Sequence, residues 1–194
     1  MSTRSKLKYS IYSLVLALMI GGIIIWIMGN NPFTIYGRVL TGSFGNTANV
    51  MSVLAYTTPL IFTGLGAVVA FRGGVFNIGG EGQLIVGGLA AVITGIYVDL
   101  PGPLPLILAM MAGFIMGGVW ALIPTLMVGR NLSALFVGTV MMNSIGAMFS
   151  EYVVKYHFLR PNASTTETLN VLDGAVLPRF NPNTQFNYGI FVAI

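Results

Sequence analysis

Long apolar runs constrain this chain more than any other feature of its sequence. Five of them contain almost no charge, and most are close to the length of about 20 residues that a helix needs to cross a bilayer. The runs are 11–28, 53–71, 84–98, 106–128 and 134–154. Because the bilayer core offers no partners for backbone groups, such runs must be helical. With 55% hydrophobic and 7% charged residues, the chain is predicted to be an integral membrane protein.

The predicted fold class is all-α, a polytopic bundle of five complete transmembrane helices and the start of a sixth. Residues 30–52 are expected to form a loop with a short interfacial helix. Three prolines make 99–105 a tight turn, and 155–187 is predicted to be a long outer loop. The sixth run, 188–194, is far too short to span a membrane. We therefore expect one transmembrane domain over 1–194 whose C-terminal half is missing.

The N-terminal charges predict the orientation. Arg4, Lys6 and Lys8 directly precede the first run, and basic residues are enriched on the cytoplasmic side. No small-residue cleavage site follows the first run, so it is expected to be retained rather than removed as a signal peptide. The sequence thus predicts a multi-pass protein of the plasma (inner) membrane with a cytoplasmic N-terminus.

A glycine-rich junction joins the second and third runs and contains the most unusual polar residues. Glu81 and Gln83 lie among Gly79, Gly80 and Gly82. Charges next to a membrane span are costly and are usually functional, and glycines allow sharp turns and close helix contacts. Arg72 and Asn77 precede them in the same junction. An acidic residue here could also simply favour a helix start, and amides could tie loops to neighbouring helices.

Polar and small residues also recur at helical spacing within the spans. In the fifth run Thr139, Asn143 and Ser150 fall within about 60° of one another at 100° per residue, so this stripe should face protein or water. Together with the junction it supplies the candidates for a solute pathway, which are Asn77, Glu81, Gln83, Thr139 and Asn143. Stripes of small residues predict helix packing. They are Gly87, Ala91 and Gly95 in the third run and Ala109, Gly113, Gly117 and Ala121 in the fourth.

Several function classes are excluded by what the sequence lacks. It has no Cys and a single His157, which rules out a thiolate or multi-histidine metal site within the chain. It has no G-x-x-x-x-G-K-[ST] motif for ATP and no hydrolase motif, so an enzyme is not expected. Its nine Lys and Arg are scattered, which argues against nucleic-acid binding.

The segment 57–88, TTPLIFTGLGAVVAFRGGVFNIGGEGQLIVGG, resembles the permease subunits of bacterial ABC importers for nucleosides and simple sugars. That group is related more distantly to the branched-chain amino acid and ribose permeases. WALIPTLM at 120–127 and MMNSIG at 141–146 support the resemblance. It implies a permease without a cofactor of its own, since ATP would be bound by a partner. The implied partners are a second permease subunit, in a homo- or heterodimer, cytoplasmic ATPase subunits, an extracytoplasmic solute-binding lipoprotein and the lipid bilayer.

Two alternatives stay open at this stage. One is a proton-coupled secondary carrier in which Glu81 loads and releases the proton. The other is a non-transporting membrane scaffold or a truncated product.

Overall fold

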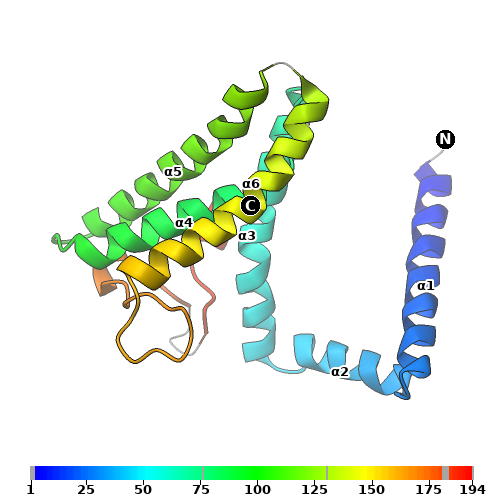
Figure 1. Ribbon diagram of the computed structural model, residues 1–194. Helices are drawn as coiled ribbons and strands as arrows, with labels where there is room; N and C mark the ends of the chain where they lie inside the picture. Colours follow the sequence, from blue (N-terminus) through cyan, green and yellow to red (C-terminus); the bar gives the residue numbers. More distant parts are fainter. Residues whose placement is uncertain (1–2, 76, 130, 181–183, 194) are drawn as a thin grey trace. The chain divides into compact units, whose positions relative to one another are not determined.

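The computed structural model describes residues 3–75, 77–129, 131–180 and 184–193. Figure 1 shows the helices in chain order. They are α1 (Thr3–Ile27), α2 (Pro32–Phe44), α3 (Thr47–Arg72), α4 (Gly80–Tyr97), α5 (Leu104–Val128), α6 (Leu132–His157), the 3-10 turn η1 (Asp173–Ala175) and α7 (Ile190–Ala193). Five of them, α1 and α3 to α6, are long and apolar enough to cross a membrane. The predicted spans are thereby confirmed, and α2 is the short helix expected within 30–52.

The helices extend beyond the apolar runs that predicted them. α4 begins at Gly80 and α6 continues to His157, whereas the runs were 84–98 and 134–154. Hydropathy marks only the part of a helix that suits lipid, and the backbone ladder continues into polar ends. α5 begins at Leu104, directly after Pro103, with Pro105 in its first turn. Proline is tolerated there because the first helical N–H groups have no partner in the helix.

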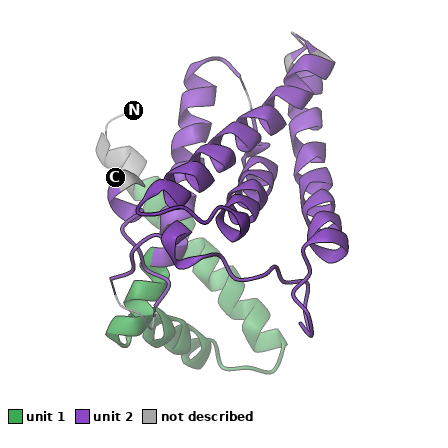
Figure 2. Ribbon diagram, turned by 90° about the vertical axis from the view of Figure 1, so that its left-hand side faces the viewer, with its two compact units in different colours: residues 1–54 green, residues 55–194 purple. Residues whose placement is uncertain are grey.

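The chain divides into two compact units, residues 1–54 and 55–194, which Figure 2 colours separately. The first unit holds α1, α2 and the beginning of α3. α2 starts where the Asn31 side chain accepts hydrogen bonds from the backbone N–H groups of Phe33 and Thr34, at 2.9 and 3.4 Å. This cap and Pro32 at the first helical position explain why the helix begins there.

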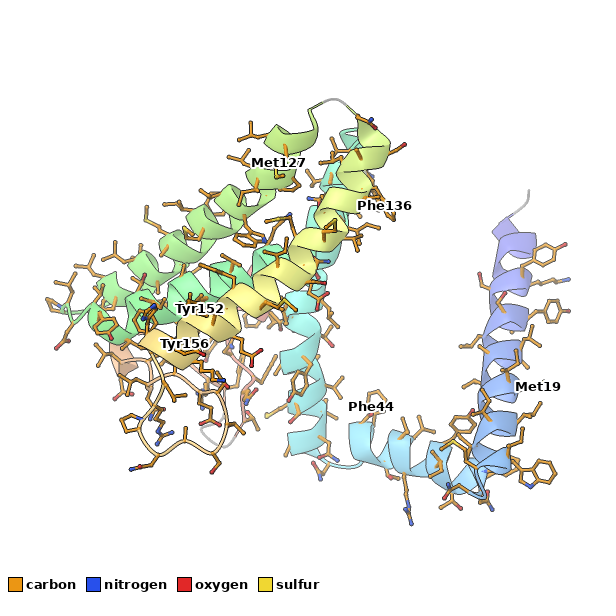
Figure 3. The ribbon with its side chains drawn as sticks, in the orientation of Figure 1. Met19, Phe44, Met127, Phe136, Tyr152 and Tyr156 are labelled. Atoms are coloured by element: carbon orange, nitrogen blue, oxygen red, sulfur yellow. The ribbon has the colours of Figure 1, made fainter. Side chains whose placement is uncertain are left out.

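The second unit is built around α4, which packs against both α5 and α6. Its buried apolar side chains come from these three helices and from the segment after α6. They include Val86, Leu89, Ala109, Leu135, Met142 and Val154. The buried set is small, and the outward faces of the spans stay apolar. Figure 3 shows Met127 pointing away from the ribbon, and this side chain is 79% exposed. Apolar surface on this scale indicates a membrane or a partner, rather than water, around the helices.

The segment after α6 is irregular over most of its length, as predicted for 155–187, and it covers one end of α4. The Leu172 N–H donates to the Gly95 carbonyl at 3.0 Å. Val171 lies so close to Gly95 that a Cβ there would come within 2.6 Å of its side chain. Gly95, predicted to contact a neighbouring helix, thus contacts this loop instead. The small size of glycine allows the neighbouring segment to come close, whether that segment is a helix or a loop.

Candidate functional site

The glycine-rich junction ends α3 with a recognisable motif. Gly74 has a φ of +77°, which glycine adopts without steric cost. Its N–H donates to the Phe71 carbonyl, while the N–H of Val75 donates to the Ala70 carbonyl at 3.0 Å. This pair of bonds is a Schellman motif, which satisfies the last carbonyls of a helix. Glycine at position 74 therefore has a local structural reason, independent of any solute.

The junction then turns into α4 through Asn77. The side-chain oxygen of Asn77 accepts a hydrogen bond from the Gly79 N–H at 2.7 Å, which is an Asx-type turn. Gly79 is the N-cap of α4 and is buried. A Cβ at Gly79 would lie 3.2 Å from the Thr139 Cβ. The turn brings the start of α4 against α6, and only a glycine fits there without displacing a neighbour.

α6 holds the start of α4 with two polar side chains. The Asn143 carboxamide accepts from the Gly82 N–H at 2.8 Å and donates to the Ile78 carbonyl at 3.0 Å. The buried Thr139 hydroxyl accepts from the Ile78 N–H at 3.4 Å and donates to Phe136 on its own helix at 2.9 Å. The first N–H groups of a helix need partners from outside it. Here Asn143 of α6 supplies one for Gly82, and Thr139 supplies one for Ile78 just before the helix.

Close backbone contact accompanies these hydrogen bonds. A Cβ at Gly82 would lie 2.7 Å from the Met142 carbonyl oxygen, and one at Gly146 would lie 3.3 Å from the Gly82 Cα. On the other side of α4, a Cβ at Gly87 would lie 2.7 Å from the Gly113 carbonyl oxygen, and one at Gly117 would lie 3.2 Å from that of Gln83. α4 is thus held between α5 and α6 at helix distances that larger residues would not allow.

The structure brings three of the five predicted pathway residues together and leaves two apart. Asn77, Thr139 and Asn143 meet at the start of α4 and bond to backbone there. Glu81, in the first turn of α4, is exposed, and Gln83 is half-buried. Their side chains take no part in the hydrogen bonds of this cluster. A contact between any of the five and a solute stays a prediction.

The five glycines singled out from the sequence differ in their surroundings. Gly79, Gly82, Gly113 and Gly117 each lie in close contact with a neighbouring segment, whereas a Cβ at Gly80 would meet nothing within 4 Å.

Sequence reasoning missed the role of Trp120. Its indole N–H donates to the Met142 carbonyl at 3.2 Å, and its ring stacks on Phe149 with centroids 5.7 Å apart. The Met142 carbonyl is the same one that limits space at Gly82, so α5 also contributes to the α4–α6 contact. An indole in a membrane span needs a partner for its N–H. The sequence therefore indicated that the Trp120 N–H has a partner, but it could not show that this partner is the Met142 carbonyl.

The cluster is made of amides, a hydroxyl and backbone groups, and all of its hydrogen bonds are neutral. Within the described residues there is no group of three or more His, Cys, Asp or Glu that could hold a metal ion. Such a cluster fixes helices against each other. Five apolar helices with a hydrogen-bonded, glycine-rich junction define a multi-pass helical membrane protein.

Within that class, the chain belongs to the family described as the branched-chain amino acid transport system / permease component, whose pattern matches residues 49–192. This confirms the resemblance noted from the junction. The chain is 31% identical over 193 residues to the guanosine ABC transporter permease protein NupP of Bacillus subtilis, covering 98% of this chain and 55% of that protein.

Two further relatives are also named as ABC transporter permease proteins. The nucleoside ABC transporter permease protein NupB of Lactococcus lactis is 25% identical, with 97% of this chain and 54% of NupB covered. The glucose ABC transporter permease protein TsgB13 of Haloferax volcanii is 27% identical, with 87% of this chain and 44% of TsgB13 covered. The chain thus spans about half the length of the curated relatives it matches. No solved structure matches it significantly.

Proposed function

We propose that this chain forms part of the permease subunit of an ABC importer that passes a nucleoside or a simple sugar across the plasma membrane. The observation that carries the proposal is the 31% identity to a guanosine permease over 98% of this chain. The glucose permease, at 27% identity, is the reason to keep simple sugars within the substrate class.

The proposal requires partners that supply energy and solute. The sequence contains no P-loop motif, so ATP would be hydrolysed by separate cytoplasmic subunits. A second permease subunit, identical or different, would complete the pathway, and an extracytoplasmic solute-binding lipoprotein would deliver the solute. With the N-terminus in the cytoplasm, as Arg4, Lys6 and Lys8 in the first turns of α1 predict, the α3–α4 junction would also lie on the cytoplasmic side.

The hydrogen bonds at the junction suggest how the pathway would move. Because Asn143 and Thr139 tie the start of α4 to α6, the two helices would shift as a pair when the pathway opens to one side. Glu81 and Gln83, outside that hydrogen-bonded cluster, are then the side chains that a polar solute would meet at the cytoplasmic end of α4.

The alternative is a proton-coupled carrier that uses Glu81. The relatives named above are ABC permeases, which favours the importer. The two mechanisms differ in the energy source, so one uptake experiment separates them.

The experiment measures uptake of radiolabelled guanosine and glucose by cells that lack the gene and by the same cells with the gene restored. Restoring the gene should recover uptake of one of these solutes. This uptake should be lost when ATP is depleted and should persist with an uncoupler while ATP is maintained. Glu81→Gln should retain uptake, as should the control Glu151→Gln, which changes an exposed carboxylate near the C-terminal end of α6. Loss of uptake with the uncoupler and in Glu81→Gln alone would favour the carrier.

A further inference from the structure

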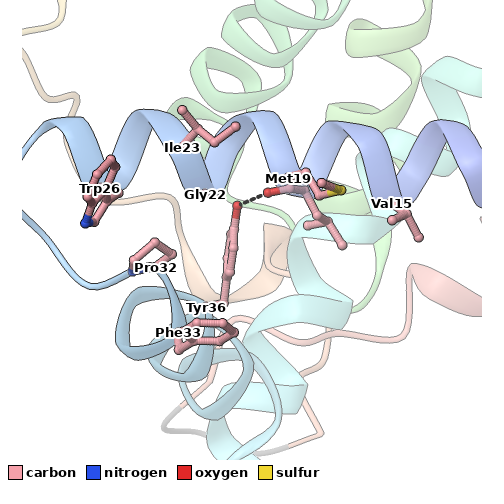
Figure 4. A pocket seen from close by; sticks show the side chains of 9 residues that line it. Val15, Met19, Gly22, Ile23, Trp26, Pro32, Phe33 and Tyr36 are labelled. Carbon is pink, nitrogen blue, oxygen red and sulfur yellow. Dashed lines mark hydrogen bonds between the residues drawn. The ribbon is translucent and has the colours of Figure 1, made fainter.

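An apolar groove lies between α1 and α2, within the first compact unit. It has a volume of about 550 Å³ and is lined by α1 from Val15 to Trp26 and by α2 from Pro32 to Tyr36. Figure 4 shows these side chains around it. Small-molecule sites in proteins enclose roughly 300–1,000 Å³, so this groove has the size of a binding site.

A fixed contact shapes the groove. The Tyr36 hydroxyl donates to the Leu18 carbonyl at 2.8 Å, the bond drawn in Figure 4. α1 accommodates the ring through two glycines. A Cβ at Gly21 would lie 2.9 Å from the Tyr36 hydroxyl, and one at Gly22 would lie 3.7 Å from the Pro32 Cβ. The glycine pair thus forms a notch that receives Tyr36. A groove that exists before its ligand arrives loses less entropy on binding.

The surroundings of the groove indicate lipid. α1 contains a segment long and apolar enough to cross a membrane, Lys8–Ile27. On α2, Phe33, Leu40 and Phe44 fall within about 40° of one another at 100° per residue, and they are 87%, 62% and 66% exposed. Arg38 lies on the opposite side of α2, so the helix has the pattern of one that lies in the membrane interface. Phe33 belongs both to this apolar face of α2 and to the lining of the groove.

The length of the groove also fits an acyl chain. From Val15 to Trp26, α1 rises about 16 Å, and the hydrocarbon of one leaflet is about 15 Å thick, half of a bilayer core. Trp26 stands at the end of α1 that joins the polar turn to α2. Indole rings are enriched at that depth because they combine an apolar body with an N–H donor.

We propose that the groove between α1 and α2 binds one acyl chain of a membrane phospholipid. The chain runs along α1 from Trp26 towards Val15, and its ester end lies beside Trp26 and the turn into α2. The ligand belongs to the leaflet that the C-terminal end of α1 faces. Tyr36 and the Gly21–Gly22 notch fix the width of the groove.

Tryptophan quenching tests the proposal, because the chain has only two tryptophans. The full chain is purified in detergent and titrated with phosphatidylcholine brominated on its acyl chains. The Trp26→Phe variant supplies the signal of Trp120, which is subtracted. Quenching of Trp26 should saturate near one lipid per chain. Gly22→Leu places a side chain in the groove. It should raise the half-saturating lipid concentration roughly tenfold, since one or two methylene groups of the acyl chain lose their packing against α1.

A matched control uses Gly42 on α2, where a Cβ would meet nothing within 4 Å and which does not line the groove. Gly42→Leu should leave the titration unchanged. Tyr36→Phe keeps the ring but removes the bond to Leu18, and it should weaken lipid binding less than Gly22→Leu does. Quenching that never saturates, or that is the same in Gly22→Leu and the unaltered chain, would overturn the proposal.

A second measurement holds even if Gly22→Leu fails to fold. Phe33, which lines the groove, is replaced by a photo-crosslinking benzoylphenylalanine in the full chain, which is then irradiated in native membranes. We expect phospholipid adducts, identified by mass after proteolysis. Adducts to a second copy of the chain or to another protein would show that protein covers the groove, and would overturn the assignment to lipid.

Discussion

Asn143 uses both ends of its carboxamide on the backbone of another segment. Its oxygen accepts from Gly82 and its nitrogen donates to Ile78, at 2.8 and 3.0 Å. The polar stripe of α6 predicted that this side chain would face protein or water, and it faces α4. A side-chain amide that bonds to two backbone groups positions the start of the helix. Loss of these two hydrogen bonds leaves a backbone donor and a backbone acceptor without partners.

Replacing Asn143 should loosen the start of α4. Asn143→Ala removes both bonds and should cost about 1–3 kcal/mol, seen as a lower melting temperature of the purified chain in detergent. Asn143→Asp retains an acceptor for Gly82 but brings a charge to the Ile78 carbonyl, so it should be no more stable than Asn143→Ala. Ser144→Ala, at an exposed neighbour on α6, serves as the control. Equal melting temperatures for Asn143→Ala and this control would show that the two bonds add nothing.

Two nearby glycines offer a matched pair at the same helix end. Gly82→Ala puts a methyl group 2.7 Å from the Met142 carbonyl oxygen, so the backbones of α4 and α6 must separate at a cost of about 1–3 kcal/mol. Gly80→Ala meets nothing within 4 Å and should be neutral or stabilising by up to about 1 kcal/mol through helix propensity. Melting temperatures in detergent check both. The reverse order would mean that the α4–α6 contact differs from the one described.

At the scale of elements, α4 is the helix that both α5 and α6 contact. α5 approaches one side of it at Gly87, Gly113 and Gly117, and α6 approaches another at Gly82 and Gly146. Apolar burial contributes little to helix association within lipid, so close packing and interhelical hydrogen bonds hold such helices together. This explains how a chain with few buried large side chains keeps a defined α4–α5–α6 arrangement.

The α4–α5 contact can be tested with adjacent positions. Gly87→Ala directs a methyl group to 2.7 Å from the Gly113 carbonyl oxygen, whereas Gly88→Ala enters open space. We expect Gly87→Ala to separate the helices and to lower the melting temperature of the purified chain in detergent. Gly88→Ala should leave the melting temperature unchanged. Equal melting temperatures in both variants would contradict the contact.

At the scale of the whole molecule, the number of spans decides which parts share a side of the membrane. Within the described residues, five candidate membrane spans, from Lys8–Ile27 to Ser133–His157, lie between Ser5 and Ser164. Cysteines placed singly at these positions should therefore react with an impermeant maleimide from opposite sides, Ser5→Cys from the cytoplasm. The measurement compares labelling of intact and permeabilised cells. Labelling of both from the same side would mean an even number of spans between them.

Much of this architecture could be predicted because lipid imposes a strong rule on sequence. Each long apolar run had to become a helix, and each did, including α3 despite Pro59 within it. Basic residues at the start of α1 and glycines at helix spacing likewise carry local information. The family could also be suggested from local sequence, because Phe71 to Gly88 combines glycines and polar residues in one short segment.

The polar contacts required the tertiary structure. No periodicity could show that Asn143 bonds to Gly82 and Ile78, because hydrogen bonds between residues about sixty positions apart depend on how α4 and α6 dock. The same holds for Gly95, whose neighbour is Val171 of a loop rather than a helix, and for the groove fixed by Tyr36 on Leu18. Hydropathy and spacing determine which segments are helices and which faces are small or polar. The packing of the helices against one another decides which donor meets which acceptor, because the distances between these groups depend on all the contacts in the fold together.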